Sequence, residues 1–201
     1  MTCPAPRAWA GEYEDAVLRA NARVQKKDYE NAIKEYQKAL ALKPNDPKVH
    51  LLLGLTYANA GKFDEAVQHS TQSIQIEPSF AAYQNLGIIF ANQGDYPRAI
   101  DAYKKALEIE PKSYRAWYQL GLVYATQLDF EHAIESYEKS IDSNPMFTEA
   151  HLGLGSAYYW SGNRDKALEQ VALLNEKGEK TKAQALEIWI KNTDEKKAAG
   201  K

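Results

Sequence analysis

A set of marker residues recurs every 33 or 34 positions along the chain, and a repeat of that length constrains its fold more than any other feature. The clearest marker is a Leu-Gly pair that recurs at this period four times, each time followed three residues later by an aromatic residue. An alanine recurs later in each unit, and a proline closes four of the units. The glycines of the pairs are Gly54, Gly87, Gly121 and Gly155, and the closing prolines are Pro44, Pro78, Pro111 and Pro145. One position is missing near Ser79 and every later marker shifts with it, so the markers belong to one repeating structural unit.

Within each unit the apolar residues recur at the spacing of an α-helix. In the second unit, Leu51, Leu55 and Ala58 fall on one stripe. Asp46 and Pro47 are typical of a helix start, because Asp caps free N–H groups and proline lacks an N–H that would stay unpaired there. First helices are predicted near 13–26, 47–60, 80–93, 114–127 and 148–161, and second helices near 29–42, 63–76, 96–109, 130–143 and 164–174.

The turn between the two helices of a unit carries a glycine in three units, at Gly61, Gly94 and Gly162. Lys27 and Leu128 occupy this position in the first and fourth units. Neither residue has the conformational freedom of glycine, so these two turns are predicted to be tighter or strained.

The markers resemble the tetratricopeptide repeat family, whose pattern is W-x2-L-G-x2-Y, then A-x3-F, then P over about 34 residues. The unit at 114–147 matches best, through Trp117, Leu120, Gly121, Tyr124, Ala133, Tyr137 and Pro145. In the first copy, Arg19 and Ala20 stand where Leu-Gly is expected and Arg23 replaces the aromatic residue, while the fifth copy lacks its closing proline. Terminal repeats depart from a consensus because one of their sides faces solvent.

The resemblance implies an all-α fold, a right-handed superhelical solenoid of about five antiparallel helix pairs with a C-terminal capping helix. The predicted organisation has a disordered leader, a solenoid, a capping helix and a disordered tail. These cover residues 1–12, 13–175, 176–192 and 193–201, and the solenoid units are 13–46, 47–79, 80–113, 114–147 and 148–175.

The composition excludes several classes of protein. A net charge of −2 without a basic cluster argues against nucleic-acid binding. The single cysteine, Cys3, excludes an internal disulfide and a cysteine-based zinc site. No stretch approaches the roughly 18 apolar residues of a membrane helix, so membrane insertion is not predicted. The compartment stays open, with the cytoplasm favoured and the periplasm or an organelle surface as alternatives.

The residue patterns of common catalytic and metal sites are missing from the sequence. It contains no HExxH, EF-hand, GxGxxG, Walker-type or nucleophile-elbow pattern. His50 and His151 hold the position of Trp117 and are predicted to pack between helices, while His69 and His132 lie far from both in the sequence. Neither catalysis nor a metal or other cofactor is predicted.

The family resemblance implies that partners lie against the first helices, which form a concave face. The corresponding groove residues are Asn21, Leu51, Leu55, Asn59, Gln84, Asn85, Ile88, Asn92, Arg115, Tyr118, Gln119, Leu122, Leu152, Tyr159 and Trp160. They form an apolar strip beside side-chain amides, which can both donate to and accept from a peptide backbone. The alternative interpretation is that Leu55, Ile88 and Leu122 are partly buried between neighbouring first helices.

The residues with which related co-chaperones hold a C-terminal carboxylate are mostly missing here, since only Asn85 matches and Arg115 keeps a charge. An amphipathic helix or an extended apolar segment suits the predicted groove better. The leading functional hypothesis is a non-catalytic adaptor that binds a peptide or helix of a partner protein. The alternatives are a self-assembling scaffold, as in bacterial envelope, pilus or organelle assembly, and a regulatory domain of a larger protein.

Overall fold

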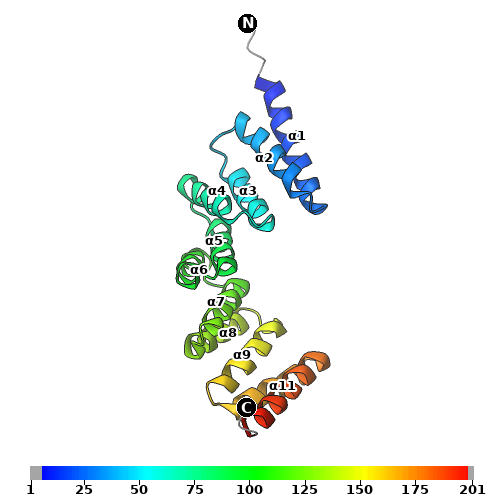
Figure 1. Cartoon of the computed structure of the whole chain (residues 1–201), viewed down its shortest axis with the longest axis vertical. Coiled ribbons are helices and arrows are strands. Elements are labelled where there is room, and N and C mark those ends of the chain that lie inside the picture. The colour runs from blue at the N-terminus through cyan, green and yellow to red at the C-terminus, as the bar shows by residue number, and fades with distance from the viewer. Residues whose placement is uncertain (1–5, 199–201) are drawn as a thin grey trace. The chain divides into compact units, whose positions relative to one another are not determined.

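The computed structural model describes residues 6–198, and all secondary-structure elements in that range are α-helices (Figure 1). They divide into two compact units at Ile109 and Glu110. The first unit contains α1 (Pro6–Gln25), α2 (Tyr29–Leu42), α3 (Pro47–Asn59), α4 (Phe63–Ile76), α5 (Phe80–Gln93) and α6 (Tyr96–Ile109). The second contains α7 (Tyr114–Thr126), α8 (Phe130–Ser143), α9 (Thr148–Trp160), α10 (Arg164–Glu176) and α11 (Lys180–Ala198). Within each unit, helices that follow one another in the chain pack together, and the predicted all-α helical-repeat fold is confirmed.

Helix formation extends further at both ends than the sequence predicted. The leader was expected to be disordered to residue 12, but α1 begins at Pro6, because proline suits the first helical position and alanine and glutamate follow it. The tail was expected to be disordered from residue 193, but α11 continues to Ala198. Asp194 anchors that extension by accepting hydrogen bonds from Tyr159 and Arg164. Residues 1–5 and 199–201 lie outside the described residues.

The turns within the helix pairs share one backbone geometry, including the two without glycine. In each turn, the N–H of the left-handed residue donates to the carbonyl oxygen three residues earlier, and the N–H of the next residue donates to the carbonyl oxygen five residues earlier. Leu128 donates to Ala125 and Asp129 to Tyr124 in this way. Leu128 and Lys27 have φ values of 61° and 58°, close to the 75° of Gly61. The two turns are therefore strained, by roughly 1–2 kcal/mol each, and they are no tighter than the glycine turns.

At each Leu-Gly pair the glycine backbone lies against atoms of a neighbouring helix and leaves no room for a Cβ atom. A Cβ atom added to Gly121 would lie 2.7 Å from Cε1 of Tyr137, and one added to Gly87 would lie 2.7 Å from Cε1 of Tyr103. Both tyrosines are buried. The alanines that recur in the second helices are fully buried as well, namely Ala32, Ala66, Ala99, Ala133 and Ala167.

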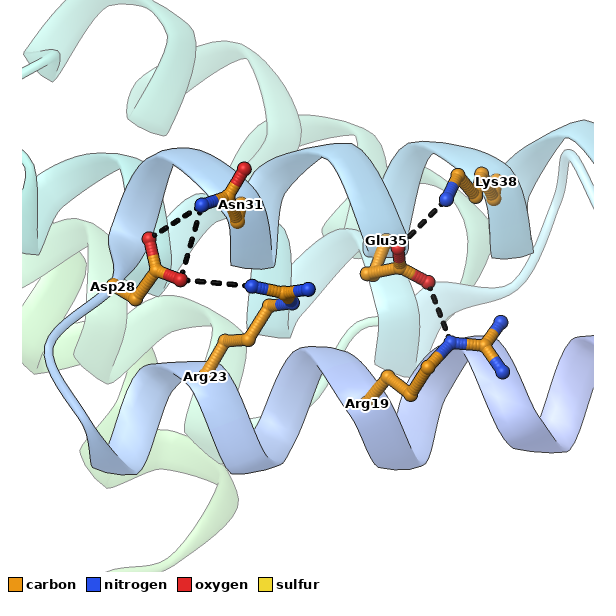
Figure 2. Close-up of polar contacts among 6 residues, drawn as sticks. All are labelled: Arg19, Arg23, Asp28, Asn31, Glu35 and Lys38. Carbon is orange, nitrogen blue, oxygen red and sulfur yellow. Dashed lines mark hydrogen bonds and ion pairs between the residues drawn. The ribbon is translucent and has the colours of Figure 1, made fainter.

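Ion pairs replace part of this apolar packing in the first helix pair, where the sequence departs from the consensus (Figure 2). Arg19 Nε lies 2.9 Å from Oε2 of the buried Glu35, whose Oε1 lies 2.6 Å from Lys38 Nζ. Arg23 Nη1 lies 2.9 Å from Asp28 Oδ2. Arginines at the Leu and aromatic positions thus connect α1 to α2 and to the turn that follows α1.

Two of the four histidines lie together, although the sequence predicted no contact between them. The Nδ1 atoms of His50 and His69 are 3.0 Å apart, and Tyr57 stacks on His69 with ring centroids 5.4 Å apart. His50 Nε2 lies 3.0 Å from the carbonyl oxygen of Pro44, which can only accept. Neutral His50 therefore donates from Nε2 and accepts at Nδ1 from His69. The pair forms because positions 19 residues apart face each other across α3 and α4.

Both histidines at the position of Trp117 are buried, as predicted. His151 Nδ1 lies 2.9 Å from Oε1 of Gln170, which is again 19 residues along the chain. Trp117 Nε1 donates to the carbonyl oxygen of Pro111 at 2.8 Å, the bond that His50 makes with Pro44. The side chains of His50 and Trp117 thus fix the start of a first helix to the proline that ends the preceding unit, whereas His151 Nε2 has no hydrogen-bond partner.

Gly121→Ala is expected to lower the free energy of unfolding by about 1–3 kcal/mol, because the added methyl group would overlap the Tyr137 ring. Gly11→Ala is the matched control, since nothing lies within 4 Å of a Cβ at this position inside α1. The free energy of unfolding of the control is expected to rise by about 0.5–1 kcal/mol, because alanine is a better helix former than glycine. Urea unfolding followed by circular dichroism measures both, and equal stability of the two variants would contradict the close-packing argument.

The stability of the first unit is expected to fall in mild acid because of His69. Burial, and then the neighbouring His50, hold the pKa of His69 below its ordinary 6.5. The unfolded chain therefore binds the proton more tightly, so this contribution to stability is full above about pH 6.5 and is lost as the pH falls below it. When the pH is lowered from about 7.5 to about 5.5, the melting temperature of His69→Gln should fall less than that of the wild type. Parallel slopes for His69→Gln and the wild type would disprove the assignment.

Candidate functional site

The second unit contains an apolar cleft of about 510 Å³ between α7, α8 and α9, here called the α7–α9 cleft. Its lining is dominated by aliphatic and aromatic side chains. The lining residues are Tyr118, Leu122, Ala125, Thr126, Leu128, Phe130, Tyr137, Glu149, Leu152, Gly153, Ser156, Ala157 and Trp160. A concave apolar surface of this size is typical of a binding site.

Helical spacing places the walls of the cleft. On α7, Tyr118, Leu122 and Thr126 are four residues apart and share one face, as Leu152, Ser156 and Trp160 do on α9. Part of this apolar area stays exposed to solvent, since Leu122 is 37 % exposed and Trp160 is 48 % exposed.

The buried ring of Tyr137 lies between two glycine backbones and helps to line the cleft. A Cβ added to Gly121 on α7 or to Gly153 on α9 would lie 2.7 or 2.8 Å from this ring. The Tyr118 ring lies beside it, with centroids 5.8 Å apart. Burial raises the pKa of Tyr137, and burial followed by the charge of Glu149 raises the pKa of Tyr118, so both hydroxyls are neutral at physiological pH.

An aromatic cluster borders the cleft where α9 ends. Phe130 at the start of α8 stacks on Trp160 with ring centroids 6.5 Å apart. Trp160 also meets Trp189 of α11 edge to face at 5.8 Å, and Trp189 meets Tyr159 at 5.1 Å. These contacts hold the partly exposed indole of Trp160 against fixed neighbours.

Charge is sparse in the cleft. Glu149 is the only ionisable carboxyl group among the lining residues. Its Oε1 lies 2.9 Å from Lys182 Nζ, and this hydrogen bond is the main reason that the pKa of Glu149 lies below its ordinary range. Thr126 and Ser156 donate their hydroxyl protons to the carbonyl oxygens of Leu122 and Leu152 in their own helices.

The cleft brings together four of the predicted groove residues: Tyr118, Leu122, Leu152 and Trp160. Arg115 and Gln119 lie on the same helix, α7, but do not line the cleft. Tyr159 was predicted to face the groove but is buried, because α11 packs on α9 and Tyr159 donates to Asp194 at 2.8 Å. The capping helix therefore covers one of the predicted contact positions.

The other predicted groove residues belong to the first unit. Leu55, Asn59 and Asn92 are exposed, while Asn21, Leu51, Gln84 and Ile88 are half-buried. Asn85 was predicted to bind a peptide backbone but is 4 % exposed. Its amide group donates to Ser70 Oγ at 2.9 Å across α4 and α5, and its Oδ1 atom has no hydrogen-bond partner. Its helix contact therefore leaves it unavailable to a ligand at the surface.

Several lining residues of the cleft were not predicted. The family pattern assigns contacts to first helices only, whereas Leu128, Phe130 and Tyr137 come from the turn and the second helix. Glu149 lies in the first turn of α9, before the first predicted contact there. One sequence signal was available, because Leu128 is an apolar residue at a position that three other units give to glycine.

Neither a metal centre nor a membrane-spanning helix is found among the described residues. Across residues 6–198, no group of three or more His, Cys, Asp or Glu residues is arranged to hold a metal ion. No helix in this range is long and apolar enough to cross a membrane.

Family comparisons agree with the repeat architecture. One family described as "TPR repeat" matches residues 20–61 and 87–127, and families described as "Tetratricopeptide repeat" match residues 47–80 and 114–147. Together these matches cover residues 20–80 and 87–147, which is more than half of the chain. No significant match was found among curated protein sequences.

Solved structures with the same fold include MamA, which is 31 % identical in sequence. That match covers 85 % of this chain and 94 % of MamA, with a TM-score of 0.76. PilF of Pseudomonas aeruginosa is 18 % identical over 95 % of this chain and 88 % of its own, with a TM-score of 0.77. YrrB is 20 % identical over 86 % of this chain and 90 % of its own, with a TM-score of 0.69. The last two likenesses show the fold alone.

The repeat markers, the helix pairs and the family matches agree with one another, and the chain belongs to the tetratricopeptide repeat family.

Proposed function

We propose that this protein is a non-catalytic adaptor that binds a segment of a partner protein in the α7–α9 cleft. The observation that carries the proposal is the cleft itself, with about 510 Å³ of apolar space bordered by the exposed side chains of Leu122 and Trp160. Exposed apolar surface of this kind is unfavourable in water unless a partner covers it.

Two features support a protein segment as the ligand. The cleft runs beside two helices instead of closing around a small molecule, and its only ionisable carboxyl group already has a lysine partner. YrrB, which shares the fold, is described as a TPR protein with an unusual peptide-binding site. That description belongs to YrrB, and it supports a peptide as the kind of ligand proposed here.

The test is a selection of peptides from a random display library on the wild-type protein, followed by affinity measurements on two variants. Leu122→Asp places a charge in the cleft, and Ile188→Asp places one on an exposed apolar residue of α11 outside it. Selected peptides are expected to bind Leu122→Asp at least about tenfold more weakly, because a buried unpaired carboxylate is costly, and to bind Ile188→Asp as tightly as the wild type.

Thermal melts followed by circular dichroism check that both variants are folded. Equal affinity of the selected peptides for Leu122→Asp and Ile188→Asp would exclude the cleft as the binding site. Light scattering on the peptide-free protein examines the self-assembling scaffold. A mass above that of one chain, reduced to that of one chain by Leu122→Asp alone, would identify a second copy as the occupant of the cleft.

A further inference from the structure

Leu128 combines two unfavourable features, an exposed apolar side chain and a strained backbone. It is 73 % exposed, the highest value among the exposed large hydrophobic residues in the described part of the chain. Its φ of 61° lies in the left-handed region, which a branched side chain disfavours. A residue that is strained and solvated at the same time gains little for the folded state from its own side chain.

The turn itself does not require a leucine. The turns at Gly61, Gly94 and Gly162 have the same hydrogen-bond pattern and φ values of 75°, 77° and 89°. The side chain of Leu128 nevertheless lines the α7–α9 cleft, together with Phe130 and Trp160. Its position suits contact with something that enters the cleft.

The lining restricts the backbone conformation of what can enter. An extended segment buries backbone N–H and C=O groups that need partners from the walls, whereas an α-helix satisfies its own. The walls here are mostly apolar, and Thr126 and Ser156 already donate to their own helices. The side-chain amides predicted to serve an extended backbone, Gln119 among them, do not line this cleft. An apolar helix therefore fits the cleft better than an extended peptide.

The charges indicate the rest of the partner's chemistry. Lys182 is shared between Glu149, at 2.9 Å, and Glu179, at 3.6 Å, so this group carries one more negative charge than positive. Glu149 and Trp160 stand near opposite ends of α9, about 16 Å apart at the helical rise per residue. A helix of about three turns lying along α9 spans that length. A basic side chain at its end nearest Glu149 would complement the excess negative charge.

We infer that Leu128 is a binding residue that packs over an apolar partner helix seated in the α7–α9 cleft, with a basic residue of that helix near Glu149. The inference rests on the proposed function and specifies its ligand. The strained turn keeps an apolar side chain at the rim where glycine would leave the bound helix uncovered.

The experiment uses two display libraries of 16-residue peptides with equal composition of Leu, Ala, Gln and Lys. One arranges leucines at the helical period and the other alternates them at the strand period. Enrichment on the wild-type protein from the helical library alone is expected, with lysine concentrated toward one end of the enriched sequences. Enrichment of cleft-binding peptides from the strand-period library alone would overturn the inference.

The enriched peptides are then measured against Leu128→Gly. This variant should keep or raise the melting temperature, because glycine relieves the strain, yet bind about tenfold more weakly, because an apolar contact is lost. Lys27→Gly is the matched control at the equivalent turn of the first unit. It should also keep or raise the melting temperature but leave affinity unchanged, since Lys27 does not line the cleft. A loss of affinity without a loss of stability separates a binding role from a structural one.

The outcomes separate the inference from the proposed function. If helical peptides lose affinity for Leu122→Asp but not for Leu128→Gly, the cleft binds helices and the assigned role of Leu128 is wrong. If strand-period peptides are enriched and are sensitive to Leu122→Asp, the adaptor function stands and the helical ligand is excluded. If no peptide from either library is sensitive to Leu122→Asp, both the inference and the proposed function fail.

Discussion

The contact between a glycine backbone and a tyrosine ring on the neighbouring helix is the constraint on which the packing of the α5–α6 and α7–α8 pairs depends. In α7 and α8 the ring of Tyr137 fills the space that a side chain at Gly121 would occupy, and Gly153 of α9 approaches the same ring. Because the interior is close-packed, these positions accept almost no added volume. The same ring lines the cleft, so the packing of three helices and the shape of the candidate site depend on one side chain.

The turns show how a repeat array can carry strain. One backbone geometry serves glycine, lysine and leucine alike, because the helices on either side determine it. Packing of the pair therefore over-determines the turn, and a residue that disfavours the conformation is accommodated at a cost of roughly 1–2 kcal/mol. A turn residue can then vary for reasons unrelated to folding, provided that the rest of the pair is well packed.

The helices could be predicted from the sequence because their signals are local. Apolar spacing, Asp46 with Pro47 and the closing prolines place most helix boundaries within one or two residues of those observed. The site could be predicted only in part, because accessibility depends on contacts between elements. Tyr159 has the right position on α9 but α11 covers it, and Asn85 turns to Ser70 instead of to solvent. The end of α11 was missed for the same reason, since the partners of Asp194 lie about 30 residues earlier in the chain.

Binding specificity in this chain is expected to come from departures from the repeat consensus, because consensus residues are occupied in holding the helices together. Leu120, Gly121 and Tyr137 are buried or in close contact, and they leave no surface with which a partner could be distinguished. Two exposed apolar residues of the cleft, Leu122 and Leu128, lie outside the family pattern. A partner that contacts these side chains recognises residues found in one unit only, not the residues that all units share. The same repeat can therefore keep its fold while its binding surface changes, since the two sets of residues overlap little.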